Sequence, residues 1–431
     1  MDRPYVLTGL VVIALSLGLL AYLLEFSSVE LWTGILVASV LVVVSVPMIR
    51  RLARTEGDPW LVRTLIWGLV ATLLFSVFRY LFIFALNDGS ADAGLYDAAG
   101  RTFVERLRAG EPIHPIPVMR GFPVESQRLG DVTGAVYALT SPSIHAGFFV
   151  FAYVCFWGKV LMIRGFRAAV PEGDHRRFAL LVLFLPSLLF WPSSIGKEAL
   201  MFGCLGIIMY GGALLLAPRP RFAGAIYFAV GALLVLMVRP HIALMSILGF
   251  GLAMVVGVLG GSGGGAAGAI RGRTPRLVAL GVVAVLAVYG ITRLGQQFEE
   301  FGEEGAQAVL EGALEQSSIG GSEFAPVAVT GPREAPAAVV SVLFRPFPWE
   351  ASSASSLLTA AESLLLLGLV AVSWRRLMSL PRLMLRRPFL VSCLAYVLLF
   401  SIAFSYIGNF GILARKRVLV FPVVLVLLAL P

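Results

Sequence analysis

Long runs of apolar residues, separated by short basic segments, dominate the pattern along the chain. A helix needs about 20 residues to cross the ~30 Å hydrocarbon core of a bilayer, and backbone groups at that depth are satisfied only within helices or closed barrels. The runs do not alternate as strands do, so they predict helices. We therefore expect an all-α polytopic membrane protein, with residues 1–431 forming one transmembrane domain. About twelve spans are predicted at this length, near 5–24, 31–49, 63–86, 144–163, 178–192, 198–217, 223–238, 242–259, 277–293, 356–373, 389–405 and 418–430.

Arginines set the predicted orientation of these spans. They gather in the short segments after every second span, as at 50–54, 164–177 and 375–387. The positive-inside rule then places both termini inside. Two long segments, near 87–143 and 294–355, face outward in this topology, and such loops are where function concentrates. The first run is expected to be a retained span, because it lacks the cleavage site of a signal peptide.

Composition supports a membrane protein and argues against several other classes. Of the residues, 58% are hydrophobic and 14% charged, and the mean hydropathy is +0.88. Soluble domains are nearer ~45–50% apolar and ~25% charged. The net charge of +9 is explained by loop arginines, and without a nucleic-acid-binding pattern it predicts no nucleic-acid partner. The three cysteines lie inside apolar runs and form no CxxC pair, which predicts neither a disulfide framework nor a zinc site.

The first outer segment contains the strongest candidate for chemistry. Apolar residues recur there at helical spacing, at Tyr96, Ala99, Phe103 and Leu107. With charges on the opposite face, this pattern predicts an amphipathic helix along the outer membrane surface. Asp92 precedes Tyr96 by one turn on the same side and is a candidate general base, with Asp88 as the fallback. A plain helix-capping role for either carboxylate is the alternative.

Two stretches resemble the GT-C superfamily of membrane glycosyltransferases. The first is Asp92-Ala-Gly-Leu-Tyr96-Asp-Ala-Ala99, followed by Phe103, Leu107 and Gly110-Glu-Pro112. The second is Pro186-Ser-Leu-Leu-Phe-Trp191-Pro192-Ser-Ser-Ile-Gly-Lys197-Glu198-Ala-Leu200, a Pro-containing span and a short turn before a polar or acidic residue. The resemblance implies a polyprenyl-phosphate-linked sugar donor and catalysis on the outer face. By position, the resemblance makes Asp92 the catalytic acidic residue, with Asp88 as the fallback.

Some basic residues depart from the positive-inside pattern and are candidates for binding an anion. Arg79 lies within a predicted span, where an ionisable group is costly and is usually functional or paired; a structural pair with Glu362 is the alternative. Lys197 opens a span at the outer surface, where the helix N-terminus favours phosphate. Serine capping with a snorkelling Lys197 is the competing interpretation.

Further cations lie in predicted outer turns. Arg239 and His241 flank Pro240 before one span, and Arg345 belongs to an aromatic, proline-rich segment. Arg415 and Arg417 sit in a basic triplet just before the last span. With Tyr96, Lys197 and Glu198, these side chains are expected to bind substrate around one outward cavity with a positive field.

The lead functional hypothesis is a cell-envelope glycosyltransferase in the bacterial plasma membrane. It would move a sugar from a polyprenyl-phosphate donor to a glycan or lipid acceptor, with membrane lipids as further partners. No cofactor is predicted, and the need for a divalent cation is left open. One alternative is an O-antigen-type polysaccharide polymerase or ligase, which would use a lipid pyrophosphate chain. Another is a transporter or flippase for an anionic lipid, which the lack of an internal repeat disfavours.

Overall fold

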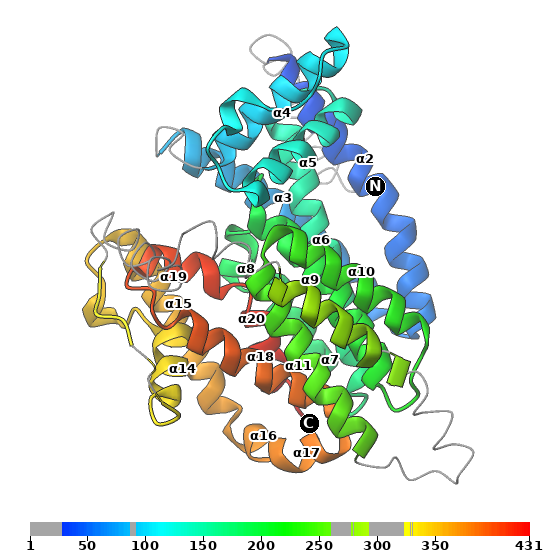
Figure 1. Ribbon diagram of the computed structural model, residues 1–431, viewed down its shortest axis with the longest axis vertical. Helices are drawn as coiled ribbons and strands as arrows, with labels where there is room; N and C mark the ends of the chain where they lie inside the picture. The colour runs from blue at the N-terminus through cyan, green and yellow to red at the C-terminus, as the bar shows by residue number, and fades with distance from the viewer. Residues whose placement is uncertain are drawn as a thin grey trace, which may run out of the picture.

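The structure is a computed structural model, and it describes residues 28–86, 92–259, 277–278, 280–292, 323–327, 329 and 331–431. The predictions for the first span, for Asp88 and for residues 294–322 of the outer segment near 294–355 fall outside these residues. The described part of the chain is built from helices (Figure 1). Their bounds are α2 Val29–Glu56, α3 Trp60–Phe84, α4 Asp92–Ala109, α5 Val124–Thr140, α6 Ile144–Ala169, α7 His175–Phe184, α8 Pro186–Phe190, α9 Lys197–Leu216, α10 Ala223–Val238, α11 Pro240–Leu259, α14 Ala335–Phe344, α15 Ala354–Val372, α16 Trp374–Met378, α17 Leu380–Arg386, α18 Pro388–Phe404, α19 Phe410–Arg417 and α20 Phe421–Leu428.

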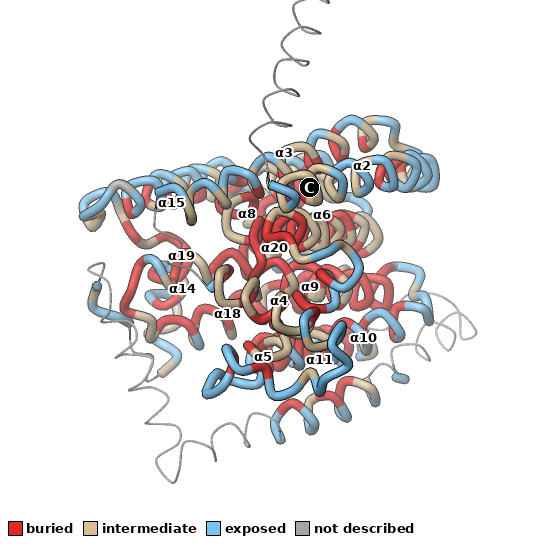
Figure 2. Tube along the Cα trace, turned by 90° about the horizontal axis from the view of Figure 1, so that it is seen from above, coloured by how far each residue is buried: buried red, intermediate tan, exposed pale blue. Residues whose placement is uncertain are grey.

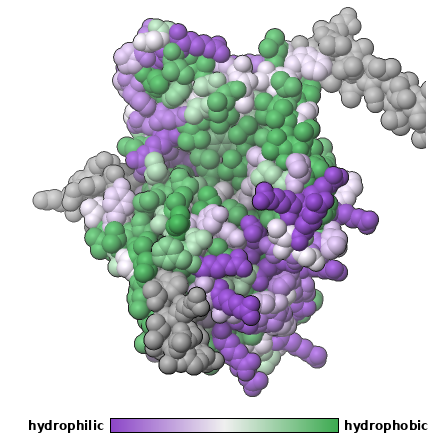
Figure 3. All heavy atoms as spheres, turned by 90° about the vertical axis from the view of Figure 1, so that its right-hand side faces the viewer, coloured by the Kyte–Doolittle hydropathy of each residue, from purple (hydrophilic) through white to green (hydrophobic). Residues whose placement is uncertain are grey.

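Among the described residues, six helices are long and apolar enough to cross a membrane: α2, α3, α6, α9, α11 and residues Ser355–Val372 of α15. Four shorter apolar helices accompany them: α10, α14, α18 and Leu280–Thr292. Large apolar side chains on the outer helices are exposed, such as Val43, Leu74 and Leu358. A broad hydrophobic area covers much of the face in Figure 3. The chain is therefore an all-α, membrane-embedded protein, because exposure of apolar surface of this extent to water is unfavourable.

The buried centre of the helical body contains α6, α9 and α20, whereas α2, α3 and α15 expose one side (Figure 2). Glycines let α6 and α9 approach closely. A Cβ at Gly158 would overlap the Phe202 carbonyl, and one at Gly206 would overlap the backbone of Gly158. Small residues at such contacts are typical of packed membrane helices, whose association rests on van der Waals packing and hydrogen bonds.

The predicted surface helix is α4, and it ends at Gly110, whose φ of +69° is left-handed. Tyr96 and Ala99 are buried, as the periodicity predicted. They pack largely on α5, which was not predicted, and a Cβ at Gly134 would overlap the ring of Phe103. Helices α4 and α5 lie at the opposite end of the molecule from α16 and α17 (Figure 1).

Two predicted spans take a different form in the structure. The segment near 178–192 is divided into α7 and α8, because Pro186 favours an extended Leu185 (φ −62°, ψ 129°). Pro192 has no N–H to donate to the Leu188 carbonyl, and Lys159 Nζ donates to that oxygen instead, at 2.6 Å. The basic triplet 415–417, predicted in a loop before the last span, forms the last turn of α19. That helix begins after Asn409, whose side chain accepts from two backbone N–H groups.

Candidate functional site

A group of charged and polar side chains meets where α4 and α5 join the helical body. We call it the cationic cluster. It comprises Arg79 of α3, Asp92 and Tyr96 of α4, Ser126 of α5, Lys197 and Glu198 of α9, Arg239 and His241 at the start of α11, and Arg415 and Lys416 of α19.

Glu198 is the buried anion at the centre of the cluster. Its side chain is 4% exposed, and each carboxylate oxygen has its own guanidinium partner. Oε1 accepts from Arg239 Nη2 at 2.6 Å, and Oε2 accepts from Arg415 Nη2 at 2.9 Å. An ionised carboxylate is buried at such low exposure only when it is paired in this way. Glu198 therefore fixes two arginines from distant parts of the chain at one point.

Arg415 connects the buried carboxylate to an accessible one. The same Nη2 donates to Asp92 Oδ2 at 2.8 Å, and the Asp92 side chain is 53% exposed. Asp92 is the first residue of α4, so the bond also ties α4 to α19. One guanidinium thus bridges a fixed anion and an anion that can be released to solvent or substrate.

Lys197 and Tyr96 meet at a serine that the sequence patterns did not single out. Lys197 Nζ donates to Ser126 Oγ at 2.8 Å, and the Tyr96 hydroxyl is hydrogen-bonded to the same side chain. Burial raises the pKa of Tyr96, so its hydroxyl stays protonated and available as a donor at neutral pH. Ser126 is buried and links α5 to both α4 and α9.

Arg79 is held by aromatic rings rather than by a carboxylate. Its guanidinium carbon lies 4.3 Å from the Phe190 ring centre and 4.9 Å from that of Trp191. Nε is buried and has no hydrogen-bond partner within the described chain. The predicted alternative partner, Glu362, accepts from the backbone N–H of Ser187 and lies 3.9 Å from Arg417. Arg79 instead feels the charges of Arg415, Glu198 and Asp92.

Within the part of the chain that the structure describes, Arg239 keeps one donor group free for a ligand, and Lys416 lies near it. Arg239 is 4% exposed, and its Nη1 has no partner within the described residues. Lys416 lies within electrostatic range of Arg239 and Arg415. Burial, and then the neighbouring Arg239, lower the pKa of Lys416 to about 7. The His241 ring packs at a tilt of 56° against Phe404, with 5.9 Å between ring centres, and is within electrostatic range of Arg239 and Lys416.

Five basic side chains therefore lie around Asp92 and Glu198: Arg79, Lys197, Arg239, Arg415 and Lys416. A third carboxylate, Glu125, is within electrostatic range of Lys197. Such an excess of basic groups, partly withdrawn from water, is suited to binding a multiply charged anion. In the described residues, no three His, Cys, Asp or Glu side chains group as a metal site.

Two predicted binding residues lie apart from the cluster. Arg345 pairs with Glu350 at 2.5 Å and stacks on Phe324 at 4.1 Å. The Arg417 side chain is 1% exposed, and it donates to the Arg345 carbonyl at 2.6 Å and to Ser363 Oγ at 3.1 Å. These contacts connect α14, α15 and α19. Both arginines are occupied by contacts within the protein, so we assign neither of them a contact with substrate.

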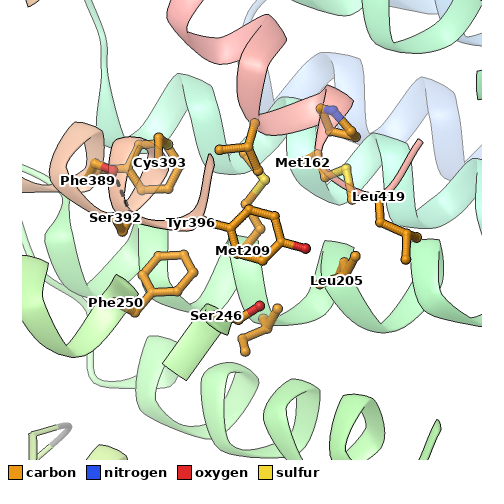
Figure 4. Close-up of a pocket in the computed structure, with 13 residues that line it drawn as sticks. Met162, Leu205, Met209, Ser246, Phe250, Phe389, Ser392, Cys393, Tyr396 and Leu419 are labelled. Carbon is orange, nitrogen blue, oxygen red and sulfur yellow. Dashed lines mark hydrogen bonds between the residues drawn. The ribbon is translucent and has the colours of Figure 1, made fainter. Parts of the chain in front are cut away.

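A small cavity lies between α6, α9, α11, α18 and α20 (Figure 4). Its volume is about 30 Å³, and its lining is mostly apolar. The Tyr396 hydroxyl is buried there, has no hydrogen-bond partner among the residues that the structure describes, and is within electrostatic range of Arg239. A water needs roughly 10–15 Å³ of such volume. The cavity can hold about two waters on this measure, and it is too small for a sugar or a lipid chain.

Comparisons of the chain with models of protein families, with curated proteins and with solved structures find no match. The functional proposal therefore rests on the chemistry and geometry of the cationic cluster.

Proposed function

We propose that the cationic cluster binds the phosphate head of a polyprenyl-phosphate-linked sugar, and that the protein is a GT-C-like glycosyltransferase of the cell envelope. The observation that carries this proposal is the position of Arg415 between buried Glu198 and accessible Asp92, with four further cations around it. A lipid phosphate enters from the bilayer, and the cluster lies where membrane helices meet α4 and α5. The acceptor is a glycan or a lipid, and the membrane is the bacterial plasma membrane.

The proposed reaction uses Asp92 as the base and the cations as the stabilisers of the leaving group. The acceptor hydroxyl loses its proton to Asp92, and its oxygen forms a bond to the anomeric carbon. The bond between that carbon and the phosphate oxygen breaks, and its electron pair stays on the polyprenyl phosphate. Preorganised guanidinium groups stabilise the charge that develops there. Phosphate competes with Asp92 for Arg415, so donor binding frees the carboxylate for proton transfer.

A twelve-span topology with both termini inside belongs to the same proposal. It places α4, α5 and Asp92 on the outer face, and the arginines of α16 and α17 on the inner face. A cysteine in place of Ser379 is then expected to react with impermeant maleimide only after the membrane is permeabilised. Labelling of that cysteine in intact cells would overturn the topology.

Anion binding is expected to weaken as the pH rises above 7, because Lys416 has a pKa of about 7. A bound dianion favours the protonated form of Lys416. At a pH where Lys416 of the free protein is neutral, anion binding therefore requires the uptake of one proton. By linkage, sulfate affinity stays level below this pKa and falls by up to about tenfold per pH unit above it. Calorimetric titration with sulfate, which keeps its charge over this range, measures the effect.

Lys416→Met is the matched variant for this titration. It is expected to bind sulfate more weakly at pH 7 and to lose most of the pH dependence. An unchanged pH profile in the variant would contradict the assignment to Lys416. Failure of the wild-type protein to bind sulfate or diphosphate at any pH would contradict the anion site itself.

A further inference from the structure

A groove opens between α3 and α7, away from the cationic cluster. Its volume is about 400 Å³, and its lining is almost entirely apolar. From α3 the lining includes Trp67, Val70, Ala71 and Leu74, with Arg63 and Thr64 as its polar residues at one end, and from α7 it includes Leu180 and Phe184. Trp67 is 65% exposed and Leu74 is 63% exposed, so the described protein does not cover this groove.

The groove continues along α3 toward the cluster. Residues 64, 67, 71, 74, 78 and 82 follow the i, i+3, i+7 spacing of one helix stripe. At its far end, Phe78 and Phe82 contact Phe190 of α8, with ring centres 6.0 and 5.2 Å apart. Phe190 is also the ring on which Arg79 stacks. One continuous apolar stripe therefore runs from the groove to a cation of the cluster.

We propose that this groove holds the isoprenoid chain of the lipid whose phosphate binds in the cationic cluster. The inference rests on the proposed function and specifies its substrate: a lipid with a single chain attached directly to phosphate. Ala71 is eight residues before Arg79, and eight helical residues rise about 12 Å. The first part of the isoprenoid chain therefore lies between the phosphate and the groove, and a later part of it lies in the groove.

A single furrow between two helices fits one chain better than a phospholipid, which carries two chains on a glycerol. Transfer of the chain from bilayer to groove brings little hydrophobic gain, because lipid tails are as apolar as the groove. The binding energy comes instead from van der Waals contacts with Trp67, Leu74 and Phe184, which are weak individually but appreciable in sum. The groove therefore contributes more to discrimination between lipid chains than to the total affinity.

Ala71→Trp fills the groove and tests the inference. Dissociation constants are measured in nanodiscs of one zwitterionic phospholipid for a long polyprenyl phosphate and for dimethylallyl phosphate, which is too short to reach Ala71. The variant is expected to bind the long lipid about tenfold more weakly, a loss of several close packing contacts, and to bind the short one as the wild type does. Val43→Trp, on the exposed side of α2, is the control and is expected to leave both unchanged.

Other outcomes overturn the inference in distinguishable ways. Equal binding of the long lipid by wild type and Ala71→Trp would show that the groove does not hold its chain. Equal weakening of both probes would show that the substitution acts through the cluster. Binding of neither probe by the wild type would overturn the proposed function instead. Photocrosslinking from p-benzoylphenylalanine in place of Leu74 provides a second readout: the chain of the polyprenyl phosphate is the expected product, and phospholipid alone contradicts the proposal.

Discussion

Asp92→Asn is expected to reduce sugar transfer by about 10²–10⁴-fold, the contribution of a positioned general base. Asparagine has nearly the size of aspartate, but its neutral amide cannot take the proton from the substrate hydroxyl. Phosphate binding is expected to be retained or tightened, because the neutral amide competes less well for Arg415 than the carboxylate 2.8 Å away does. Release of polyprenyl phosphate from a panel of polyprenyl-phosphate sugars, in proteoliposomes containing the protein, measures the transfer step.

Glu105→Gln is the matched control for this variant. Glu105 lies on the same helix, but it is exposed on the other face. The control is expected to transfer sugar at the wild-type rate. Wild-type transfer by Asp92→Asn would refute the role of Asp92. Movement of the lipid across the bilayer with no cleavage of the sugar–phosphate bond would favour the transporter alternative.

Arg417→Met is expected to destabilise the folded protein by about 3–5 kcal/mol, the usual cost of breaking a buried ion pair from one side. Arg417 donates to the carbonyl of Arg345 and to Ser363, and it lies 3.9 Å from Glu362. Methionine fills part of the space but leaves these acceptors without their donor. Denaturant titration of the detergent-solubilised protein, followed by tryptophan fluorescence, measures the loss.

Arg382→Met serves as the comparison, because Arg382 is exposed on α17. Exposed substitutions of this kind usually change stability by less than about 0.5 kcal/mol. Comparison of the two variants therefore distinguishes an arginine that holds the fold together from one that is merely solvated. Arg417→Met with wild-type stability would contradict the structural role, and it would return Arg417 to the group of substrate-binding candidates.

Most of the helical architecture could be predicted from the sequence, because apolar periodicity depends only on local residue type. Residues 144–169, for example, form the helix predicted near 144–163. The two ends of α8 were harder to predict, because a proline in an apolar run predicts either a kink or an end. Pro186 separates α8 from α7 through the extended Leu185. At the other end, Lys159 donates to the Leu188 carbonyl that Pro192 cannot satisfy.

Several members of the cationic cluster were identified because they carry charge where membrane topology disfavours it. That signal identified Arg79, Lys197, Arg239 and Arg415, which the fold brings together. It could not separate Arg415 from Arg417, since both occupy one basic triplet. Their different roles follow from the helical turn of α19, which directs one toward Glu198 and the other toward α14 and α15. Ser126 gave no signal, because a neutral serine in an unpredicted helix has no distinctive pattern.

The central claim is that the cationic cluster holds the phosphate of an isoprenoid lipid, and mass spectrometry of co-purifying lipids tests it most directly. The detergent-solubilised wild type is compared with Lys197→Ala, which removes a cation of the cluster, and with Arg382→Ala, which removes an exposed cation elsewhere. The proposal predicts a polyprenyl phosphate or polyprenyl-phosphate sugar in the wild type and in Arg382→Ala, with the signal lost in Lys197→Ala. Bulk phospholipid alone, unchanged across the three proteins, would contradict it.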